Sequence, residues 1–425
     1  MTAKRDPAKS AVKGASTTNR RLAAWRILRH RGHDHSREAD RGGAVLTPAF
    51  GIVLALTFLG FAFEQTLRPV IPLVIIDRGG SALLVGLVAA THALPALLFR
   101  PFIGRLIDGG QHLQLLRFGA LTATLAPIGV LLPGIAALAI VRFLQGSSWA
   151  LYAVSTRTLM ARLAPAHRRG EASGYFALMP AVATLLGPGI GIALYLAVGE
   201  VGPVLVAMAL GLAASGIAMR VRIPAHLSAS QPVSAGGLAP ESRMVEPSAL
   251  PPTAMITTFL AGQTLFTVYP PLYVIAIGAS VESLAIYYPA YGAVMVLSQL
   301  VAGRVSDRVG RGGATRIGCS LAIAGLATAA LGDQMWTFAV GAAGYAIAVS
   351  IVVPTMSAMA IDRAPATRLG AAMATYSIGY QMATGVSSLA WGAILSIAGF
   401  PWAFISAIGL QLVTIAASMR YAERS

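Results

Sequence analysis

Four ionisable side chains lie within long apolar stretches of this 425-residue chain. Glu64 and Arg68 are four residues apart, so a helix would place them on one face. His92 and Arg142 lie in later apolar stretches, and Glu64 and His92 would both sit roughly 12–18 Å deep in a bilayer. A carboxylate in apolar surroundings holds its proton more tightly, and a nearby arginine or an arriving cationic substrate weakens that hold. The four residues therefore predict a proton-coupling site at which Glu64 binds and releases the proton.

The same residues also allow a purely structural interpretation. Glu64 could form a permanent ion pair with Arg68 or Arg142 that holds helices together. Arg142 would sit roughly 9 Å below the end of its apolar stretch and could extend to the membrane surface. His92 could shuttle protons, bind substrate or make a structural hydrogen bond. The variant Glu64→Gln separates these interpretations, because only the first predicts the loss of proton-driven transport.

Composition indicates that a lipid bilayer surrounds these charges. Hydrophobic residues make up 56% of the chain and charged residues 11%, whereas soluble proteins carry roughly 25% charged residues. A bilayer core about 30 Å thick requires about 20 apolar residues per helix. Stretches of this size run at about 48–72, 83–102, 114–133, 136–160, 174–196, 202–219, 254–277, 284–302, 315–332, 337–361, 371–395 and 400–418.

The distribution of charge predicts that both termini lie in the cytoplasm. Eleven of the 32 Lys and Arg residues precede the first apolar stretch, which indicates a cytoplasmic tail and not a nucleic-acid site. The connections assigned to the cytoplasm carry fourteen arginines, and those assigned to the outside carry Asp77, Arg78, Glu200, Glu282 and Asp333. His30, His33 and His35 in the tail could bind a metal ion, but tails of this kind need no such role. We predict neither a metal site nor a cofactor.

The two halves of the chain repeat each other. A shift of 199 to 200 residues superimposes Pro72 on Pro271, Ser81 on Ser280, Gly104 on Gly303, Asp108 on Asp307, Pro165 on Pro365, Arg168 on Arg368 and Gly170 on Gly370. The same shift turns Glu64 into Gln263, Arg68 into Thr267 and His92 into Tyr291, and sets Arg142 against Gly341 or Ala342. The second half therefore keeps the positions and loses the charge.

These patterns predict an all-α membrane protein with twelve transmembrane helices in two pseudo-symmetric six-helix bundles. The expected order is a basic tail, a first bundle, a linker rich in Ser, Pro and Gly, a second bundle and a short tail, at 1–45, 46–222, 223–252, 253–419 and 420–425. Such parallel halves are one plan on which alternating-access transporters are built.

A polar connection in the second half resembles the signature loop of the major facilitator superfamily, and its matching residues are Gly303, Asp307, Arg308, Gly310 and Arg311. The resemblance implies a latch that is made in one state of the transporter and broken in the other. The copy in the first half keeps Gly104 and Asp108, but Gly109 and Gln111 stand where a basic residue and a glycine are expected. A tight polar turn without a gating role is the alternative for both copies.

Two further motifs resemble the same family. Arg142 and Gly146 are similar to its membrane-embedded Arg and Gly on the fourth helix, to which proton coupling is assigned. Gly187, Pro188 and Gly191 resemble the Gly-Pro motif of its exporters, chiefly drug/proton antiporters, although simple helix packing would also explain them.

The resemblance implies a monomeric secondary transporter in the inner membrane that exports a small organic molecule in exchange for protons. A proton symporter or facilitator for nutrient uptake is the alternative, followed by a receptor or scaffold that has lost transport. No phosphate-binding loop or nucleophile constellation indicates an enzyme. The excess of Arg68 and Arg142 over Glu64 favours an anionic or zwitterionic substrate. Candidates for the wall of the substrate cavity are Gln263, Tyr269, Tyr291, Tyr380 and Gln381.

Overall fold

The computed structural model describes residues 45–99, 102–103, 106, 111–165, 168–221, 245–365 and 368–422, and within these it describes only the backbone of 169–170, 300–307, 369–371 and 421–422. The described residues form helices and no strand. The helices are α2 (Pro48–Leu67), α3 (Val70–Asp77), α4 (Ala82–Leu98), α6 (His112–Leu125), η2 (Ala126–Leu131), α7 (Ile135–Leu163), α8 (Arg169–Val198), α9 (Val201–Arg220), η4 (Pro247–Ala249), α11 (Leu250–Ala261), α12 (Gln263–Thr267), α13 (Pro270–Ala276), α14 (Ser283–Leu331), α15 (Met335–Asp362) and α16 (Leu369–Ala422).

Both halves begin with a helix that breaks at the same place in the repeat. In the first half α2 ends at Leu67 and α3 begins at Val70, and in the second half α12 ends at Thr267 and α13 begins at Pro270. Pro270 has no N–H to donate to the carbonyl of Phe266, and the hydroxyl of Tyr287 donates to that carbonyl instead, at 2.7 Å. The two segments of the second half meet at 53°. The sequence predicted one span in each case. In the first half Pro48–Asp77 is one apolar span despite the interruption, whereas the bend in the second half was not predicted.

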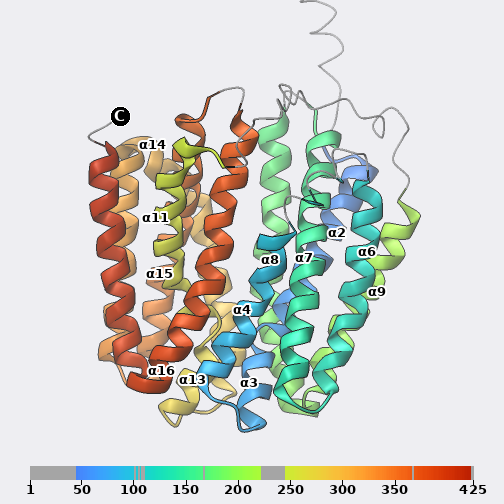
Figure 1. Cartoon of the computed structure of the whole chain (residues 1–425), viewed down its shortest axis with the longest axis vertical. Coiled ribbons are helices and arrows are strands. Elements are labelled where there is room, and N and C mark those ends of the chain that lie inside the picture. Colours follow the sequence, from blue (N-terminus) through green and yellow to red (C-terminus); the bar gives the residue numbers. More distant parts are fainter. Residues whose placement is uncertain are drawn as a thin grey trace, which may run out of the picture.

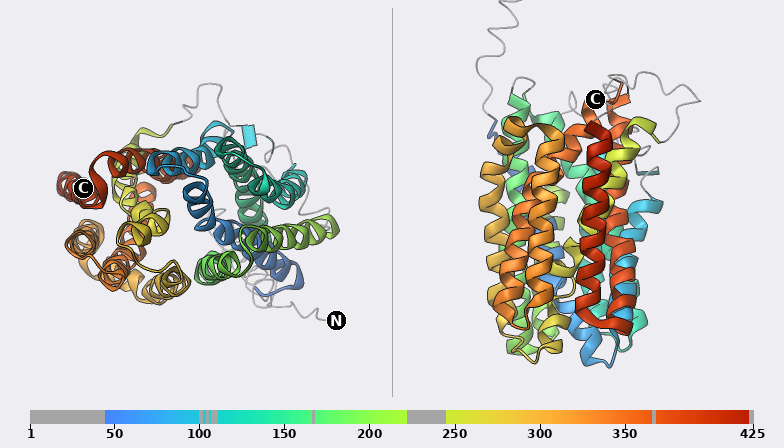
Figure 2. Two further views of the ribbon diagram at one scale, coloured as in Figure 1. Left: turned by 90° about the horizontal axis from the view of Figure 1, so that it is seen from below. Right: turned by 90° about the vertical axis from the view of Figure 1, so that its left-hand side faces the viewer.

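The helices of the two halves stand side by side. Figure 1 shows α2 to α9 on one side and α11 to α16 on the other, with α3 and α13 at the bottom of the view, which we call the lower end. The end-on view in Figure 2 shows the same two groups. The most extensive contacts between the halves are those of α4 with α16 and of α8 with α14. Glycines allow this close approach, since a Cβ on Gly86 would lie 2.3 Å from the carbonyl oxygen of Ser388.

Two of the longest helices each contain a turn. Gly310 in α14 and Gly399 in α16 have positive φ angles of 73° and 79°, which glycine adopts readily. Eight helices among the described residues are long and apolar enough to cross a membrane, or nine if the bent pair that includes α13 counts as one span. The count of twelve spans stays a prediction.

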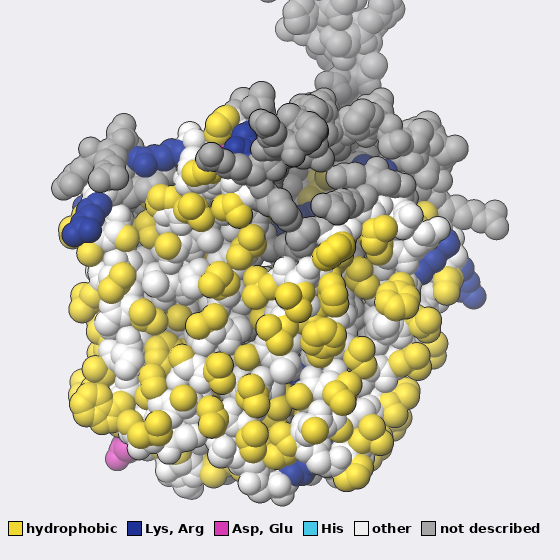
Figure 3. Space-filling view, viewed as in Figure 1, with side chains coloured by type: hydrophobic (Ala, Val, Ile, Leu, Met, Phe, Trp, Pro, Cys, Tyr) yellow, Lys and Arg dark blue, Asp and Glu magenta, His cyan; other side chains and the backbone are white. Residues whose placement is uncertain are grey.

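The surface around the middle of the helices is apolar. Large hydrophobic side chains such as Leu144, Leu212 and Leu297 are exposed there, and Figure 3 shows hydrophobic side chains across this face with Lys and Arg mainly toward the upper end. Soluble proteins rarely expose contiguous apolar patches larger than a few hundred Å². The helical middle is therefore a surface for lipid.

Several predicted features fall wholly or partly beyond the described residues. The tail at 1–44, with its histidines, and residues 423–425 lie outside them. Of the predicted linker at 223–252, residues 223–244 also lie outside, and helical structure has already begun at Pro247.

Candidate functional site

Glu64 lies at the centre of a buried cluster of charges from three helices. Its Oε1 atom accepts a hydrogen bond from Nη1 of Arg142 on α7 at 3.3 Å, and it lies 3.3 Å from Nε2 of His92 on α4. Nη2 of Arg68, one turn further along α2, is 3.8 Å from the same oxygen. Glu64, His92 and Arg142 are buried, whereas 34% of the Arg68 side chain is exposed. The four residues that the sequence singled out therefore meet around one carboxylate.

A glycine contact holds two of the three helices, α4 and α7, close together. A Cβ on Gly146 would lie 2.0 Å from the carbonyl oxygen of His92, so α7 and α4 touch through their backbones one turn after Arg142. This contact needs a residue without a side chain, since real Cβ atoms do not approach so closely. Gly146 thereby fixes the positions from which Arg142 and His92 reach Glu64.

The Gly-Pro motif of α8 packs against the segment of α2 that carries Glu64. A Cβ on Gly191 would lie 2.1 Å from the carbonyl oxygen of Thr66, and one on Gly187 would lie 2.7 Å from Cβ of Gln65. The next glycine, Gly189, faces the second half, where its Cβ would lie 2.7 Å from the ring of Pro289 on α14. The motif around Pro188 therefore joins the charged cluster to the interface between the halves.

Sequence analysis did not identify two buried glutamines, of which Gln145 belongs to the cluster and Gln65 lies beside Glu64 in the chain. Gln145 is fully buried, and its Oε1 accepts a hydrogen bond from Nη1 of Arg142 at 3.1 Å. Gln65 donates from Nε2 to the hydroxyl of Thr184 on α8 at 2.6 Å. The spacing of three residues from Arg142 was a usable signal for Gln145, because such residues share a helix face. Gln65 follows Glu64 directly and gave no signal of its own.

Several polar atoms of the cluster lack a hydrogen-bond partner among the described residues, namely Glu64 Oε2, His92 Nε2, Arg142 Nε and Gln145 Nε2, and so does Oε1 of the neighbouring Gln65. Buried polar atoms are usually paired, because an unpaired one loses its hydration without compensation. The cluster can therefore make further hydrogen bonds. The described part of the chain holds no group of three His, Cys, Asp or Glu residues that could bind a metal ion.

The second half has an uncharged counterpart at the equivalent positions. Nε2 of Gln263 donates to the hydroxyl of Tyr291 at 3.3 Å, the separation also found between His92 and Glu64. In place of Arg142 stands a close helix contact, since a Cβ on Gly341 would lie 2.3 Å from the carbonyl oxygen of Gly325.

The other predicted cavity residues differ in their surroundings. Tyr269 is fully buried and its hydroxyl donates to the carbonyl oxygen of Ser388, whereas Tyr380 is 40% exposed and Gln381 is partly buried.

The signature loops are described only in part. Gly104 and Asp108 lie outside the described residues, and of Gly303 and Asp307 only the backbone is described. Arg308 is exposed, and Gly310 forms the turn in α14. Nε of Arg311 lies 3.3 Å from Oδ2 of Asp362 at the end of α15, which ties the loop to its own half. The gating role of Asp307 stays a prediction.

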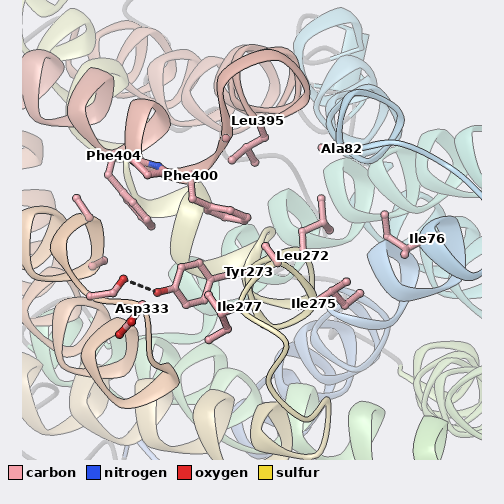
Figure 4. A pocket seen from close by; sticks show the side chains of 16 residues that line it. Ile76, Ala82, Leu272, Tyr273, Ile275, Ile277, Asp333, Leu395, Phe400 and Phe404 are labelled. Atoms are coloured by element: carbon pink, nitrogen blue, oxygen red, sulfur yellow. Dashed lines mark hydrogen bonds between the residues drawn. The ribbon is translucent and has the colours of Figure 1, made fainter.

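A cavity of about 520 Å³ lies away from this cluster, at the lower end of the molecule. Apolar residues of α3, α13, α14 and α16 line most of it, and Figure 4 shows Tyr273 and Phe400 on its wall. The hydroxyl of Tyr273 donates to the carbonyl oxygen of Gly332 at 3.1 Å. None of the predicted site residues lines this cavity.

Comparison with known proteins identifies relatives by sequence. The family model described as Major Facilitator Superfamily matches residues 53–333 and 257–425. The staphylopine export protein of Staphylococcus aureus (strain Mu50) is 25% identical over 153 residues, 36% of this chain and 38% of that protein. The uncharacterized MFS-type transporter YhhS of Escherichia coli (strain K12) is 27% identical over 118 residues, 28% and 29% of the two chains. These matches thus span less than two fifths of either relative.

Solved structures share the fold at low sequence identity. A D-xylose-proton symporter superimposes with a TM-score of 0.72 at 16% identity, over 87% of this chain and 96% of that one. A mutant of the nucleoside transporter NupG superimposes with a TM-score of 0.70 at 12% identity, over 88% and 99%. At these identities the likeness concerns the fold alone.

Proposed function

This chain belongs to the Major Facilitator Superfamily and is a multi-pass membrane transporter, and from that premise we propose that it exports a small organic molecule in exchange for protons. The observation that carries the proposal is the buried carboxylate of Glu64, which three basic side chains share. Ionisable residues inside a membrane are costly and mark ion or substrate pathways. The match to a staphylopine export protein supports the direction of transport.

We further propose twelve spans, with both termini in the cytoplasm. Dividing α14 at Gly310 and α16 at Gly399 gives the second half as many spans as the first. On this topology the lower end in Figure 1 faces outward. There Arg78 donates to the carbonyl oxygen of Leu132 and pairs with Glu200, both at 2.8 Å.

Proton coupling follows from the unequal hold of the basic residues on Glu64. Arg142 is buried and hydrogen-bonded to both Glu64 and Gln145, so it is fixed. Arg68 is partly exposed and lies beyond hydrogen-bond distance, so it can withdraw. A proton that neutralises Glu64 removes the attraction for Arg68 and for any cationic group of the substrate. Proton and substrate therefore compete for one carboxylate, which is what an exchanger requires.

One observation favours uptake by proton symport as the second candidate. The cluster carries two arginines against one carboxylate, and protonation of Glu64 would leave both arginines without a counter-charge. A purely anionic substrate would then bind together with the proton and not against it. The direction of the proton gradient that drives transport distinguishes the two candidates.

The test is a substrate screen in a bacterial strain that lacks its own efflux pumps. Cells that express the wild-type protein should resist, and accumulate less of, some compounds of the screen, and this protection should disappear in Glu64→Gln. Glu282→Gln is the matched control, because Glu282 is an exposed acid outside the helices. Counterflow of a selected compound in proteoliposomes then separates a transporter from a scaffold. Protection that survives in Glu64→Gln, or a complete absence of counterflow, would reject the proposal.

A further inference from the structure

We infer that Glu64 and Arg68 together form the recognition site for a zwitterionic cargo, which carries a carboxylate and a protonated amine a few bonds apart. The inference rests on the proposed function for the transport of that cargo. It adds that the Glu64–Arg68 pair selects the cargo, beyond a role in proton binding or in holding helices together.

The Glu64–Arg68 pair is the loosest contact in the cluster. Nη2 of Arg68 lies 3.8 Å from Oε1 of Glu64, beyond hydrogen-bond distance, whereas Arg142 and His92 approach the same atom to 3.3 Å. Glu64 Oε2 has no hydrogen-bond partner among the described residues. The carboxylate therefore keeps an acceptor for an ammonium group, and the guanidinium is not committed to it.

The position of Arg68 in the chain explains why it is free to bind something else. Arg68 is the last residue before Pro69, at the break between α2 and α3. It keeps a third of its side chain exposed. A guanidinium offers five N–H donors in a planar fork that matches a carboxylate.

The two side chains offer complementary groups to such a ligand. The guanidinium of Arg68 donates hydrogen bonds, and Oε2 of Glu64, which has no partner among the described residues, accepts them. A donor and an acceptor of opposite charge, side by side, match the two ends of a zwitterion.

Charge and hydrogen bonding together favour a zwitterion over a singly charged ligand. A zwitterion that inserts between Glu64 and Arg68 pairs its ammonium with the carboxylate and its carboxylate with the guanidinium, so the net charge of the cluster is unchanged. The cluster carries two arginines against one carboxylate, so a lone cation would add to an existing excess of positive charge in a medium of low dielectric constant, where unpaired charge is expensive. A lone anion could pair with Arg68, but it would leave Oε2 of Glu64 without a donor. Protonation of Glu64 would release the ammonium end, which agrees with exchange against protons.

The test measures ligand-induced stabilisation of the purified full-length protein in detergent. The probes are three matched series built on L-phenylalanine, L-leucine and L-histidine, each with the amino acid, its deaminated acid and its decarboxylated amine. The amino acid of at least one series should raise the Tm of the wild type in a saturable manner, and its two singly charged partners should not. In Arg68→Gln the apparent affinity should fall ~10- to 100-fold, as expected for a lost charge-assisted contact.

Two further variants make the result decisive. Arg316→Gln, an exposed arginine on α14, should bind like the wild type. Arg68→Lys keeps the charge but not the fork, should retain part of the shift, and replaces Arg68→Gln if that variant does not fold. An acid or amine that stabilises as well as its amino acid, a shift that survives in Arg68→Gln, or no shift with any amino acid up to its solubility limit would overturn the inference.

The outcome is separable from that of the proposed function. Export of singly charged compounds that depends on Glu64 would keep the proposed function and overturn the zwitterion site. Zwitterion binding by a protein that shows no counterflow would keep the zwitterion site and overturn the proposed function.

Discussion

The two halves of this transporter hold the same pair of positions at the same separation, with different chemistry. In the first half His92 and Glu64 lie 3.3 Å apart, and in the second half Gln263 and Tyr291 lie 3.3 Å apart. The first helix of each half also breaks at the same point of the repeat. Geometry is therefore duplicated, and charge is not.

The difference at the position of Arg142 shows how each half uses this geometry. The first half inserts a guanidinium that reaches Glu64, and the second half places Gly341 against the backbone of α14. We infer that the second half supplies a rigid neutral wall, while the first half supplies the group that titrates. The second half thus serves as an internal control for what the charges contribute.

The largest expected effect on stability follows from removal of Arg142. Arg142→Met leaves the buried carboxylate of Glu64 without its main hydrogen-bond donor, and we expect a loss of about 3–5 kcal/mol in the free energy of unfolding. Denaturant unfolding in detergent measures it. The double variant Glu64→Gln with Arg142→Met should recover part of that loss, because the uncompensated charge is gone. No recovery would show that the arginine stabilises by packing alone.

A smaller effect is expected at the glycine that sets the spacing of α4 and α7. Gly146→Ala should cost about 1–3 kcal/mol, because its Cβ would meet the carbonyl oxygen of His92. Gly216→Ala in α9 is the matched control, since nothing lies within 4 Å of a Cβ there. It should leave the Tm unchanged or raise it. Equal Tm values for the two variants would contradict the assigned contact.

The smallest effect is expected in the neutral pair of the second half. Gln263→Leu removes one uncharged hydrogen bond to Tyr291 and should cost about 1 kcal/mol. Thermal unfolding of Gln263→Leu and of Arg142→Met, measured in parallel against the wild type, compares the two losses of stability directly. If the two variants lost the same stability, the charged cluster would be no more than a second packing contact.

Hydropathy predicted the helices well and their breaks poorly. The span expected at 136–160 is α7, Ile135–Leu163, and the one expected at 174–196 is α8, Arg169–Val198. Both helices extend beyond the apolar stretch, because backbone hydrogen bonds continue where side chains become polar. The interruption at Arg68 and Pro69 was missed because the mean hydropathy of the whole stretch stays high despite the polar residues that precede Pro69.

Charge and spacing in the sequence indicated which residues form the site, but not which basic residue lies closest to Glu64. The spacing of Glu64 and Arg68 correctly placed them on one face, but the sequence left open whether Arg68 or Arg142 would be the closer partner of Glu64. The structure makes Arg142 the close partner, because Gly146 brings α7 against α4. Contacts between helices that are distant in sequence depend on such packing, and the spacing of residues within one helix does not predict it.

The most direct test of the account is the response of transport to an imposed proton gradient. Proteoliposomes would contain the wild type or Glu64→Gln, and a compound selected by the resistance screen would be followed with and without the gradient. We predict that the gradient accelerates transport by the wild type in the direction opposite to proton flow, and that Glu64→Gln exchanges the compound without responding to the gradient. An undiminished response to the gradient in Glu64→Gln would contradict the assignment of Glu64 as the coupling group.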